Sequence, residues 1–427
     1  MPAGTVPPVR LSSGPPVRCL VVLSGGRGRR SDRAHYAVPV SEPRRSPGSQ
    51  ASLREANRGR VVAAVKRHGG LTQVELAGAT GLSPATVSNI VKELVATGAL
   101  HATPSTSSGR RALRVTLPHG LGLVAGVHVS PRHLRLALSD LNGTVLAERH
   151  MPLARDHRAD AELDKTALLV MDMAESVESS MDEVLAVGLA VAAPIDRRTG
   201  MTARGGIFRG WDGLPIGESL ARRVGKPVQV DNSANLSALA EHRSGAARGR
   251  DTSITLDVGT GIGAGLILDG RLFRGHHGVA GEFGHTPVVP HGPICRCGNR
   301  GCLEAVAGAP AVLESIRDEV GTLKTADLIL RAMSGDPVCI RAIADAGRAI
   351  GTAAVGLCNV LDPERLVVTG EFARAGELLL GPMRHALESM LIVDADGTPD
   401  VVQGQLGEKA AVTGALAVAI EAVDVRH

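Results

Sequence analysis

The pattern of hydrophobic and polar positions divides the chain into three stretches. Residues 1–50 are rich in Pro, Arg, Ser and Gly and show no sustained period, so we expect a disordered tail. From residue 51 to residue 118, apolar residues recur first at helical spacing and then in two strand-like runs. After Pro118, strand-like and helical patterns alternate, which is typical of an α/β domain over residues 119–427.

Two short helices with complete capping signals are predicted in the second stretch. Thr72 and Glu75 fit a capping box at the start of the first helix, which should end near Gly81. Ser83 should cap the second helix, with Pro84 at its first position. Two capped helices joined by a Gly-containing turn are typical of a helix-turn-helix.

A wing is predicted directly after these helices. The stretch from Leu100 to Leu117 has two strand-like runs around the turn P-S-T-S-S-G-R-R. Small polar residues near a helix N-terminus and basic residues at a wing tip are suited to base edges and phosphates. The alternative is a small helical bundle that contacts another protein. The residues expected to contact DNA are Gln73, Ser83, Thr86, Ser88, Asn89, Lys92, Arg110 and Arg111.

The third stretch contains the same strand pattern twice. Residues 121–149 and 252–275 each predict three consecutive strands joined by turns, about 130 residues apart. The repeat predicts two duplicated lobes, over about 119–230 and 231–410, with a cleft between them. The main helical patterns cover 160–180, 234–247, 304–319, 338–360 and 408–423.

Charge is distributed unevenly along the chain. The formal net charge is +4, but residues 1–53 and 54–118 each carry +6, so the remainder carries about −8. A basic N-terminal part on an acidic body favours a head that binds a polyanion. For the tail, a basic arm that adds non-specific DNA affinity and a start codon assigned too far upstream remain alternatives.

Apolar runs are short throughout the chain. None approaches the ~20 residues of a membrane helix, and none resembles the core of a signal peptide. We therefore expect a cytoplasmic protein with no membrane partner, in a reducing compartment that suits thiolate metal ligands.

A metal site is predicted in the segment from residue 285 to residue 302. Three cysteines fall within eight positions, and a histidine precedes the first by ten. Three Cys and one His form a known closed zinc site with a structural role. Unrelated buried thiols, or a disulfide that leaves one cysteine over, are the alternatives. The predicted ligands are His285, Cys295, Cys297 and Cys302.

Two carboxylates bracket the predicted metal ligands. Glu282 lies three residues before the histidine, and Glu304 lies two residues after the last cysteine. Because a carboxylate can accept two hydrogen bonds from neighbouring hydroxyls, these residues predict a polyol site beside the metal.

These residues resemble the ROK family, which groups bacterial sugar kinases with repressors in the actin-like ATPase superfamily. The resemblance runs from about residue 54 to the C-terminus and is most specific in G-E-F-G-H and C-R-C-G-N-R-G-C-L-E. It implies a two-lobed actin-like (ribonuclease H-like) fold and a structural Zn²⁺ on the four predicted ligands. The family's repressors carry a helix-turn-helix and its kinases do not. By resemblance, the sugar-binding residues are Asn232, Glu282, His285 and Glu304.

The positions for phosphate transfer depart from the family's kinases. Where the kinases have Asp-x-Gly-Gly-Thr, this chain has His128 and, three residues later, Pro131, which lacks a backbone N–H for a phosphate. Ser233 stands at the position of the catalytic aspartate, and a neutral hydroxyl cannot take the sugar's proton at neutral pH. The glycine-rich stretch Asp257–Gly265 is intact. Its glycines are explained equally well by nucleotide binding and by tight packing between strands.

The predicted fold class is α/β, with an N-terminal winged helix-turn-helix and a two-lobed ROK domain. We expect a sequence-specific DNA-binding transcriptional regulator of carbohydrate metabolism, acting as a repressor, whose ROK domain senses a sugar or phosphosugar and is not an enzyme. Its partners would be double-stranded operator DNA and further copies of the chain in a homo-dimer or homo-tetramer. The alternatives are an ATP-dependent sugar kinase with a DNA-binding head and a regulator controlled by a protein partner.

Overall fold

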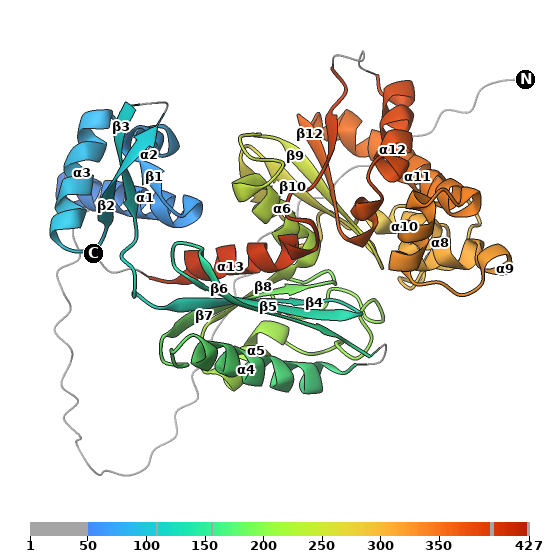
Figure 1. Ribbon diagram of the computed structural model, residues 1–427, viewed down its shortest axis with the longest axis horizontal. Coiled ribbons are helices and arrows are strands. Elements are labelled where there is room, and N and C mark those ends of the chain that lie inside the picture. Colours follow the sequence, from blue (N-terminus) through green and yellow to red (C-terminus); the bar gives the residue numbers. More distant parts are fainter. Residues whose placement is uncertain (1–49, 108–109, 155–156, 393–396, 425–427) are drawn as a thin grey trace, which may run out of the picture. The chain divides into compact units, whose positions relative to one another are not determined.

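The computed structural model describes residues 50–107, 110–154, 157–392 and 397–424 (Figure 1). The predicted disordered tail lies outside the described residues except for its last residue, which begins the first helix. Within the described ranges, no helix is both long and apolar enough to cross a membrane.

The described chain begins with a winged helix-turn-helix built from three helices and three strands. β2 and β3 pair antiparallel from His101↔Thr116 to Ser107↔Arg110, which confirms the predicted wing. The sequence pattern missed a two-residue strand that pairs with β3. The elements are α1 (Gln50–His68), β1 (Leu71–Thr72), α2 (Gln73–Thr80), α3 (Pro84–Ala96), β2 (His101–Ser107) and β3 (Arg110–Thr116).

The ends of α2 and α3 are fixed by the capping residues that the sequence predicts. The Thr72 hydroxyl accepts the Glu75 backbone N–H, and the Glu75 carboxylate accepts the Thr72 backbone N–H at 2.7 Å. Gly81 ends α2 with a φ of 68°. The Ser83 hydroxyl accepts the Thr86 backbone N–H at 3.2 Å. Each cap satisfies N–H groups that have no partner inside the helix.

The first lobe is a five-stranded sheet with the strand order β6-β5-β4-β7-β8. β4, β5 and β6 form an antiparallel meander, and β7 and β8 are added in parallel. Its elements are β4 (Leu123–Val129), β5 (His133–Asp140), β6 (Val145–Pro152), α4 (Ala159–Ser176), β7 (Val184–Val191), α5 (Ile216–Val224) and β8 (Val228–Asn232).

The second lobe repeats this topology in the strand order β11-β10-β9-β12-β13. Again three antiparallel strands are followed by two parallel ones, which confirms the predicted duplication. The strands are β9 (Ser253–Val258), β10 (Ile262–Leu268), β11 (Arg271–Phe273), β12 (Arg365–Thr369) and β13 (Asp400–Gln403). The helices are α6 (Ser233–Ser244), η1 (Phe283–His285), α7 (Leu303–Ala307), α8 (Ala309–Ser315), α9 (Arg317–Val320), α10 (Thr325–Met333), α11 (Pro337–Leu361), η2 (Glu371–Ala375), α12 (Glu377–Met390), η4 (Gly407–Lys409) and α13 (Ala410–Ala422).

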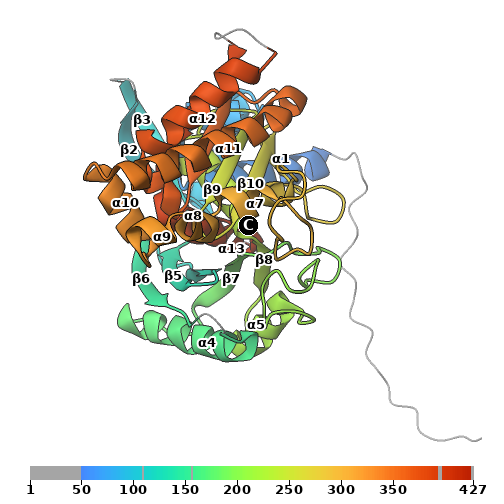
Figure 2. The same cartoon turned by 90° about the vertical axis from the view of Figure 1, so that its right-hand side faces the viewer.

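Helices cover both faces of each sheet (Figures 1 and 2). α4 and α5 pack on one face of the first sheet, and α13 packs on the other. α6 covers one face of the second sheet, while α11 and α12 form the main core with the other. α6 and α13 also pack against each other, so these two helices form a layer between the sheets.

One predicted helix, over 304–319, is wrong. The structure has three short helices there, because the backbone leaves the helical region at Gly308 (φ −68°, ψ 151°). Pro310 follows in the first turn of α8, where its missing N–H is tolerated. The other predicted helices agree with α4, α6, α11 and α13 to within a few residues.

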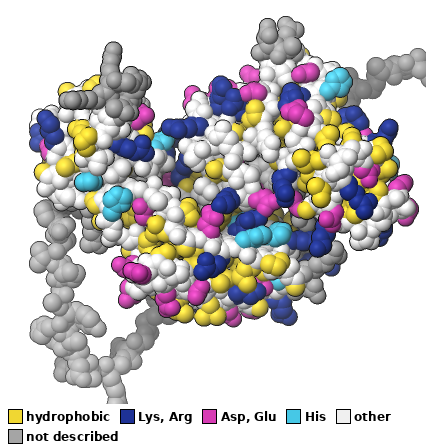
Figure 3. Space-filling view, in the orientation of Figure 1, with side chains coloured by type: hydrophobic (Ala, Val, Ile, Leu, Met, Phe, Trp, Pro, Cys, Tyr) yellow, Lys and Arg dark blue, Asp and Glu magenta, His cyan; other side chains and the backbone are white. Residues whose placement is uncertain are grey.

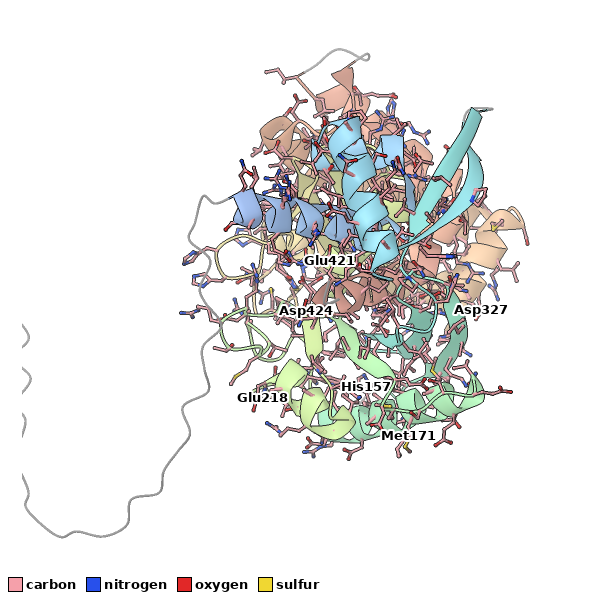
Figure 4. The ribbon with its side chains drawn as sticks, turned by 90° about the vertical axis from the view of Figure 1, so that its left-hand side faces the viewer. His157, Met171, Glu218, Asp327, Glu421 and Asp424 are labelled. Carbon is pink, nitrogen blue, oxygen red and sulfur yellow. The ribbon has the colours of Figure 1, made fainter. Side chains whose placement is uncertain are left out.

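The single tryptophan of the chain lies in the core of the first lobe, in the segment before α5. Trp211 is fully buried and stacks on Phe208 with ring centroids 5.0 Å apart. Its indole N–H donates to Nδ1 of His157, a buried residue labelled in Figure 4, at 3.3 Å.

The C-terminal part of α13 contacts α1 and α6. The carboxylate of Glu421, labelled in Figure 4, forms an ion pair with Arg243 of α6 and lies 3.7 Å from Nε of Arg67 in α1. Lys66 of α1 donates to the backbone oxygen of Val423. One helix therefore contacts both the helix-turn-helix module and the layer between the lobes.

Candidate functional site

A cavity of about 370 Å³ is lined by both lobes. Its walls come from β4, β5 and β6, from the start of α6, from the glycine-rich turn between β9 and β10, from the segment around η1, and from η2 and η4. This volume is in the range of small-molecule sites. All four residues predicted to bind a sugar line it: Asn232, Glu282, His285 and Glu304.

Asn232 both caps a helix and faces the cavity. Its side-chain oxygen accepts the Ala234 backbone N–H at 2.7 Å and thereby caps α6. Its amide nitrogen donates to the Ala193 backbone oxygen at 3.1 Å and to Oε1 of Glu282 at 3.2 Å. Because its oxygen caps the helix, the side chain of Asn232 is held in the orientation that lets its amide nitrogen donate to Glu282.

Glu282 is a carboxylate without a charged partner of opposite sign in direct contact. Burial, followed by the nearby carboxylate of Glu304, raises the pKa of Glu282 to about 7, against a smaller opposing effect of Arg296. Oε2 of Glu282 lies 3.8 Å from Nε2 of His285. A carboxylate that titrates near neutral pH can either accept or donate a hydrogen bond to a hydroxyl.

Glu304 differs from Glu282 because it is paired with a residue that the sequence interpretation missed. Arg296 donates to both of its oxygens at 2.7 Å and also to the Ile207 backbone oxygen at 3.2 Å. The Ile262 backbone N–H is a further donor to Glu304, at 3.2 Å. The only available signal was the place of this arginine between two predicted metal ligands.

The four predicted metal ligands converge. Their ligand atoms all lie within 4.8 Å of one another, and the three cysteines are buried. Sγ of Cys295 lies 3.5 Å from Nδ1 of His285, and the sulfurs of Cys297 and Cys302 are 3.7 Å apart. With Zn–S bonds near 2.3 Å, a tetrahedral ion places two sulfurs about 3.8 Å apart. The donor set and its spacing therefore fit Zn²⁺.

The histidine side chain lies between the cysteine cluster and the cavity. Nδ1 of His285 is on the cysteine side, while Nε2 points toward Glu282. If a metal held Nδ1, Nε2 would carry the proton and could donate it to a ligand in the cavity. The same cluster would thus keep one wall of the cavity in a fixed conformation.

The positions that differ from the sugar kinases also line the cavity. His128 is on β4, Pro131 is in the turn between β4 and β5, and Ser233 is the first residue of α6. The neighbouring Asp231 does not line the cavity. It pairs with Arg274 at 2.6 Å and accepts from the Asn235 side chain at 2.9 Å.

Close packing accounts for two glycines of the glycine-rich stretch, one in β10 and one in the turn before it. A Cβ on Gly265 would lie 2.4 Å from the Ala234 backbone oxygen and from the Ala238 side chain of α6. A Cβ on Gly261 would lie 2.6 Å from the Glu304 carboxylate and 2.8 Å from Arg296. The backbone contact requires glycine at residue 265 whether or not a nucleotide binds, and a larger residue at 261 would displace the side chains of Glu304 and Arg296.

The residues predicted to contact DNA lie on α2, on α3 and at the start of β3. Gln73 begins α2; Asn89 and Lys92 are exposed on α3, and Thr86 and Ser88 are partly exposed. Ser83 is exposed, although its hydroxyl is engaged in capping α3. Two more lie at the wing, and their side chains are outside the described residues: Arg110 and Arg111.

Two family models match the chain in adjacent segments. Residues 124–422 match the ROK family, and residues 56–111 match the MarR family. The second match covers the helix-turn-helix and the start of β3, and the first covers both lobes.

Both repressors and sugar kinases are similar to this chain. A putative xylose repressor of Caldicellulosiruptor sp. (strain Rt8B.4) is 25% identical and covers 87% of this chain and 97% of the repressor. A glucokinase of Thermotoga maritima is 35% identical and covers 57% of this chain and 82% of the kinase.

One solved structure is similar over most of the chain. It is that of a ROK family transcriptional regulator described as a homolog of the E. coli MLC protein. Its TM-score is 0.70 at 24% identity, and it covers 86% of this chain and 96% of that one, which shows a shared fold. Since the ROK match alone spans most of the sequence, this chain belongs to the ROK family.

Proposed function

We propose that this chain is a transcriptional regulator that binds operator DNA and responds to a sugar or sugar derivative. The observation that carries the proposal is the combination of two features in one chain. A capped helix-turn-helix with a wing precedes a ROK domain whose cavity brings together Asn232, Glu282, His285 and Glu304.

The extent of the similarity supports regulation rather than catalysis. The xylose repressor alignment covers 87% of this chain, which is more than residues 124–422 can supply. It therefore extends beyond the ROK match, while the glucokinase alignment covers 57%. A repressor of carbohydrate metabolism is the function best supported for this chain.

We further propose that the ROK domain does not phosphorylate its ligand. Ser233 lines the cavity at the position of the catalytic aspartate, and the nearest acidic neighbour in sequence, Asp231, is held by Arg274. Loss of a general base typically lowers a rate by ~10²–10⁴. His128 and Pro131 replace a carboxylate and a backbone N–H that would serve Mg²⁺ and phosphate.

The DNA interface in this proposal is the exposed part of α3 together with the wing. Small polar side chains on a recognition helix can reach base edges, whereas basic residues at the wing meet phosphates. Operators read by paired half-sites need paired heads, so the regulator would act as a homo-dimer or homo-tetramer. The contacts expected are those of Gln73, Ser83, Thr86, Ser88, Asn89, Lys92, Arg110 and Arg111.

A structural Zn²⁺ on His285, Cys295, Cys297 and Cys302 completes the proposal. When bound, such an ion would link the four residues and leave no open position for catalysis. His285 would then present Nε2 to a sugar hydroxyl, beside the carboxylate of Glu282. Asn232 and Glu304, which line the same cavity, would form further hydrogen bonds with the sugar.

Footprinting on the DNA upstream of the protein's own gene tests this function. The measurement is repeated with a panel of sugars and sugar phosphates, and operator affinity is followed by fluorescence anisotropy. A sugar that is sensed should change operator affinity about 5–150-fold, which corresponds to a coupling of roughly 1–3 kcal/mol. If no sugar alters either operator affinity or thermal stability, control by a protein partner is the better explanation.

A further inference from the structure

A loop of the first lobe lies against the second lobe beside the cavity (Figure 2). It connects β7 to α5 and has no regular helix or strand from Pro194 to Trp211. We name this loop the strap. Its apolar residue Ile207 lines the cavity together with the four residues predicted to bind a sugar.

Two neighbouring residues attach the strap to different lobes. The side chain of Phe208 is buried in the core of the first lobe, where it stacks on Trp211. The side chain of Ile207 is only 6% exposed and packs instead with the three cysteines of the metal cluster, which belong to the second lobe. The strap therefore joins the lobes at this point.

A side chain of the second lobe holds the strap at the same place. Arg296 donates from Nη1 to the Ile207 backbone oxygen at 3.2 Å, and from Nε and Nη2 to the two oxygens of Glu304 at 2.7 Å. Glu304 is buried and also accepts the Ile262 backbone N–H. The carboxylate thus fixes the guanidinium group in the orientation that reaches the strap.

The strap has a second attachment to the same lobe. The Arg197 backbone N–H donates to the His277 backbone oxygen at 3.1 Å, and a Cβ on Gly278 would lie 2.7 Å from the Ile195 backbone oxygen. Between the two attachments, residues 203–205 are exposed. Because exposed loops with few buried contacts open at low free energy, the attachments determine whether this part of the strap stays in place.

A different group of residues lines the rest of the cavity. Figure 3 shows histidine and charged side chains gathered where the first lobe meets the second. The polar lining residues from β5, β6 and η4 include His133, Arg135, His150 and Glu408. The strap instead contributes to the wall beside Asn232, Glu282 and Glu304, where the sugar is expected.

We propose that Arg296 and Ile207 form a clasp between the lobes, which holds the strap as a wall of the effector cavity while the cysteine cluster contains its metal. The inference rests on the proposed function in treating the cavity as an effector site. Release of the clasp removes Ile207 from the wall and lets the lobes separate there. Arg296 is a positioning residue, because it acts through the strap and Glu304 and need not touch the ligand.

The metal is relevant because the cysteine loop makes both contacts of the clasp. Ile207 packs on the cysteine side chains, and Arg296 lies between Cys295 and Cys297 in the sequence. A metal would cross-link these cysteines to Cys302 and His285. Without the cross-link, the loop loses the constraint that fixes the position of both contacts. The regulator would then sense its sugar only with the cluster loaded.

Limited trypsin digestion of the full-length, zinc-loaded protein tests the proposal without effector or DNA. Exposed arginines of the strap lie on both sides of Ile207, and mass spectrometry follows cleavage after Arg204 and after Arg209. Cleavage tracks the population of the opened state when opening is fast. In Arg296→Gln, cleavage at both sites should be about tenfold faster, because a hydrogen bond from a charged donor is lost. Cleavage elsewhere in the ROK domain should keep its wild-type rate.

Two further variants separate the clasp from the pairing of Glu304. Ile207→Ala keeps the Arg296–Glu304 pair and the backbone oxygen but loses the packing on the cysteines, so it should also accelerate cleavage of the strap. Arg296→Lys keeps a cation beside Glu304 but lacks the fork that reaches both partners at once, so it should not restore wild-type resistance.

The remaining samples test the metal and control for the lost trypsin site. Wild-type protein freed of metal by a chelator under reducing conditions should be cleaved in the strap like the variants. Arg300→Gln removes an exposed arginine from the same cysteine loop, as Arg296→Gln does, and should digest like the wild type. Circular dichroism checks that every variant is folded.

Unchanged cleavage after Arg204 and Arg209 in both Arg296→Gln and Ile207→Ala would overturn the inference, because other contacts would then hold the strap. Acceleration in Arg296→Gln alone would overturn it as well, since the effect would come from an unpaired Glu304. Wild-type resistance of the metal-free protein would refute the dependence on metal. None of these results bears on the proposed function, which is tested separately by operator affinity with the sugar panel.

Discussion

At the level of single residues, the two carboxylates Glu282 and Glu304 of the cavity differ in whether they have a cationic partner. Glu304 is held by Arg296 through two bonds of 2.7 Å, whereas Glu282 meets only an amide and an imidazole. Because burial raises the pKa of Glu282 to about 7, its proton is exchanged near neutral pH. The two carboxylates thus offer a ligand different hydrogen-bonding roles although they are the same kind of residue.

The proposal that Ser233 replaces a catalytic aspartate leads to a kinetic prediction. The wild-type protein should show no ATP-dependent phosphorylation over a panel of sugars, measured by coupled release of ADP. Restoring a carboxylate with Ser233→Asp should give at most weak turnover, because His128 and Pro131 still lack the groups for Mg²⁺ and phosphate.

The decisive control for this prediction is Ser233→Ala, which removes the hydroxyl without adding charge. Clear turnover by the wild type that disappears in Ser233→Ala would mean that the chain is a sugar kinase with a DNA-binding head.

The cysteine cluster leads to a prediction on metal content and stability. Purified protein should contain about one Zn²⁺ per chain by mass spectrometry of metals. Cys297→Ser should lose the metal and lower the melting temperature, since binding energy at a structural zinc site contributes directly to folding. Cys358→Ser, a change at a buried cysteine of α11 outside the cluster, should keep the zinc. Metal-free wild-type protein of undiminished stability would refute the zinc site.

The spacing of residue types in the sequence is sufficient to predict that His285 and three cysteines converge, and that Asn232, Glu282, His285 and Glu304 lie together. It is not sufficient for Arg296, because an arginine between cysteines can point to solvent or inward with equal chemical plausibility. The burial of Glu304 decides between these directions, since a buried carboxylate requires a partner. That His128, Arg135 and His150 lie side by side was likewise missed, because they come from three strands whose register only the fold determines.

At the level of helices and strands, capping residues determine where α3, the proposed recognition helix, begins. Ser83 caps α3, and in the first turns of this helix Thr86, Ser88 and Asn89 are at least partly exposed. Val87, Ile90 and Val91 are buried on the opposite side. This division follows from helical periodicity, and the exposed residues are among those that the sequence predicts to contact DNA. The position of the strand β1 was not predicted, because two residues are too few to give a period.

The outward residues of α3 and the wing give a prediction on operator binding. The double variant Asn89→Ala/Arg110→Ala should lower specific operator affinity at least tenfold, because a base contact contributes roughly 1–3 kcal/mol. Binding to unrelated DNA should fall less and should lose part of its salt dependence with the arginine. The readout is anisotropy at several salt concentrations, with Arg331→Ala of α10 as the charge-matched control. Unchanged operator affinity would place the DNA surface elsewhere.

At the level of the whole molecule, α6 and α13 connect the cavity to the helix-turn-helix module. α6 begins at Asn232 and Ser233, which line the cavity, and its later residue Arg243 pairs with Glu421 of α13. α13 begins beside Glu408 at the cavity and ends where Glu421 meets Arg67 of α1. A change in either lobe around a ligand therefore has a continuous packed route to α1.

The duplicated lobes were predicted from their repeated meanders, whereas the two parallel strands that complete each sheet were not. A parallel strand needs a long crossover, so β12 is separated in sequence from the strand that it pairs with, β9, by more than a hundred residues. Local periodicity cannot reveal a pairing over that distance. The same limitation explains why the pairing of Asp231 with Arg274, which keeps that carboxylate away from the cavity, follows only from the structure.

The burial of Trp211 against Phe208 and His157 has a practical consequence for spectroscopy. Because the chain has one tryptophan, its intrinsic fluorescence reports on the first lobe alone, while far-ultraviolet circular dichroism averages over both lobes. Unfolding curves from the two signals coincide only if the lobes unfold together. A separation of the curves would measure how independently the lobes unfold, and an effector that bridges them should bring the curves together.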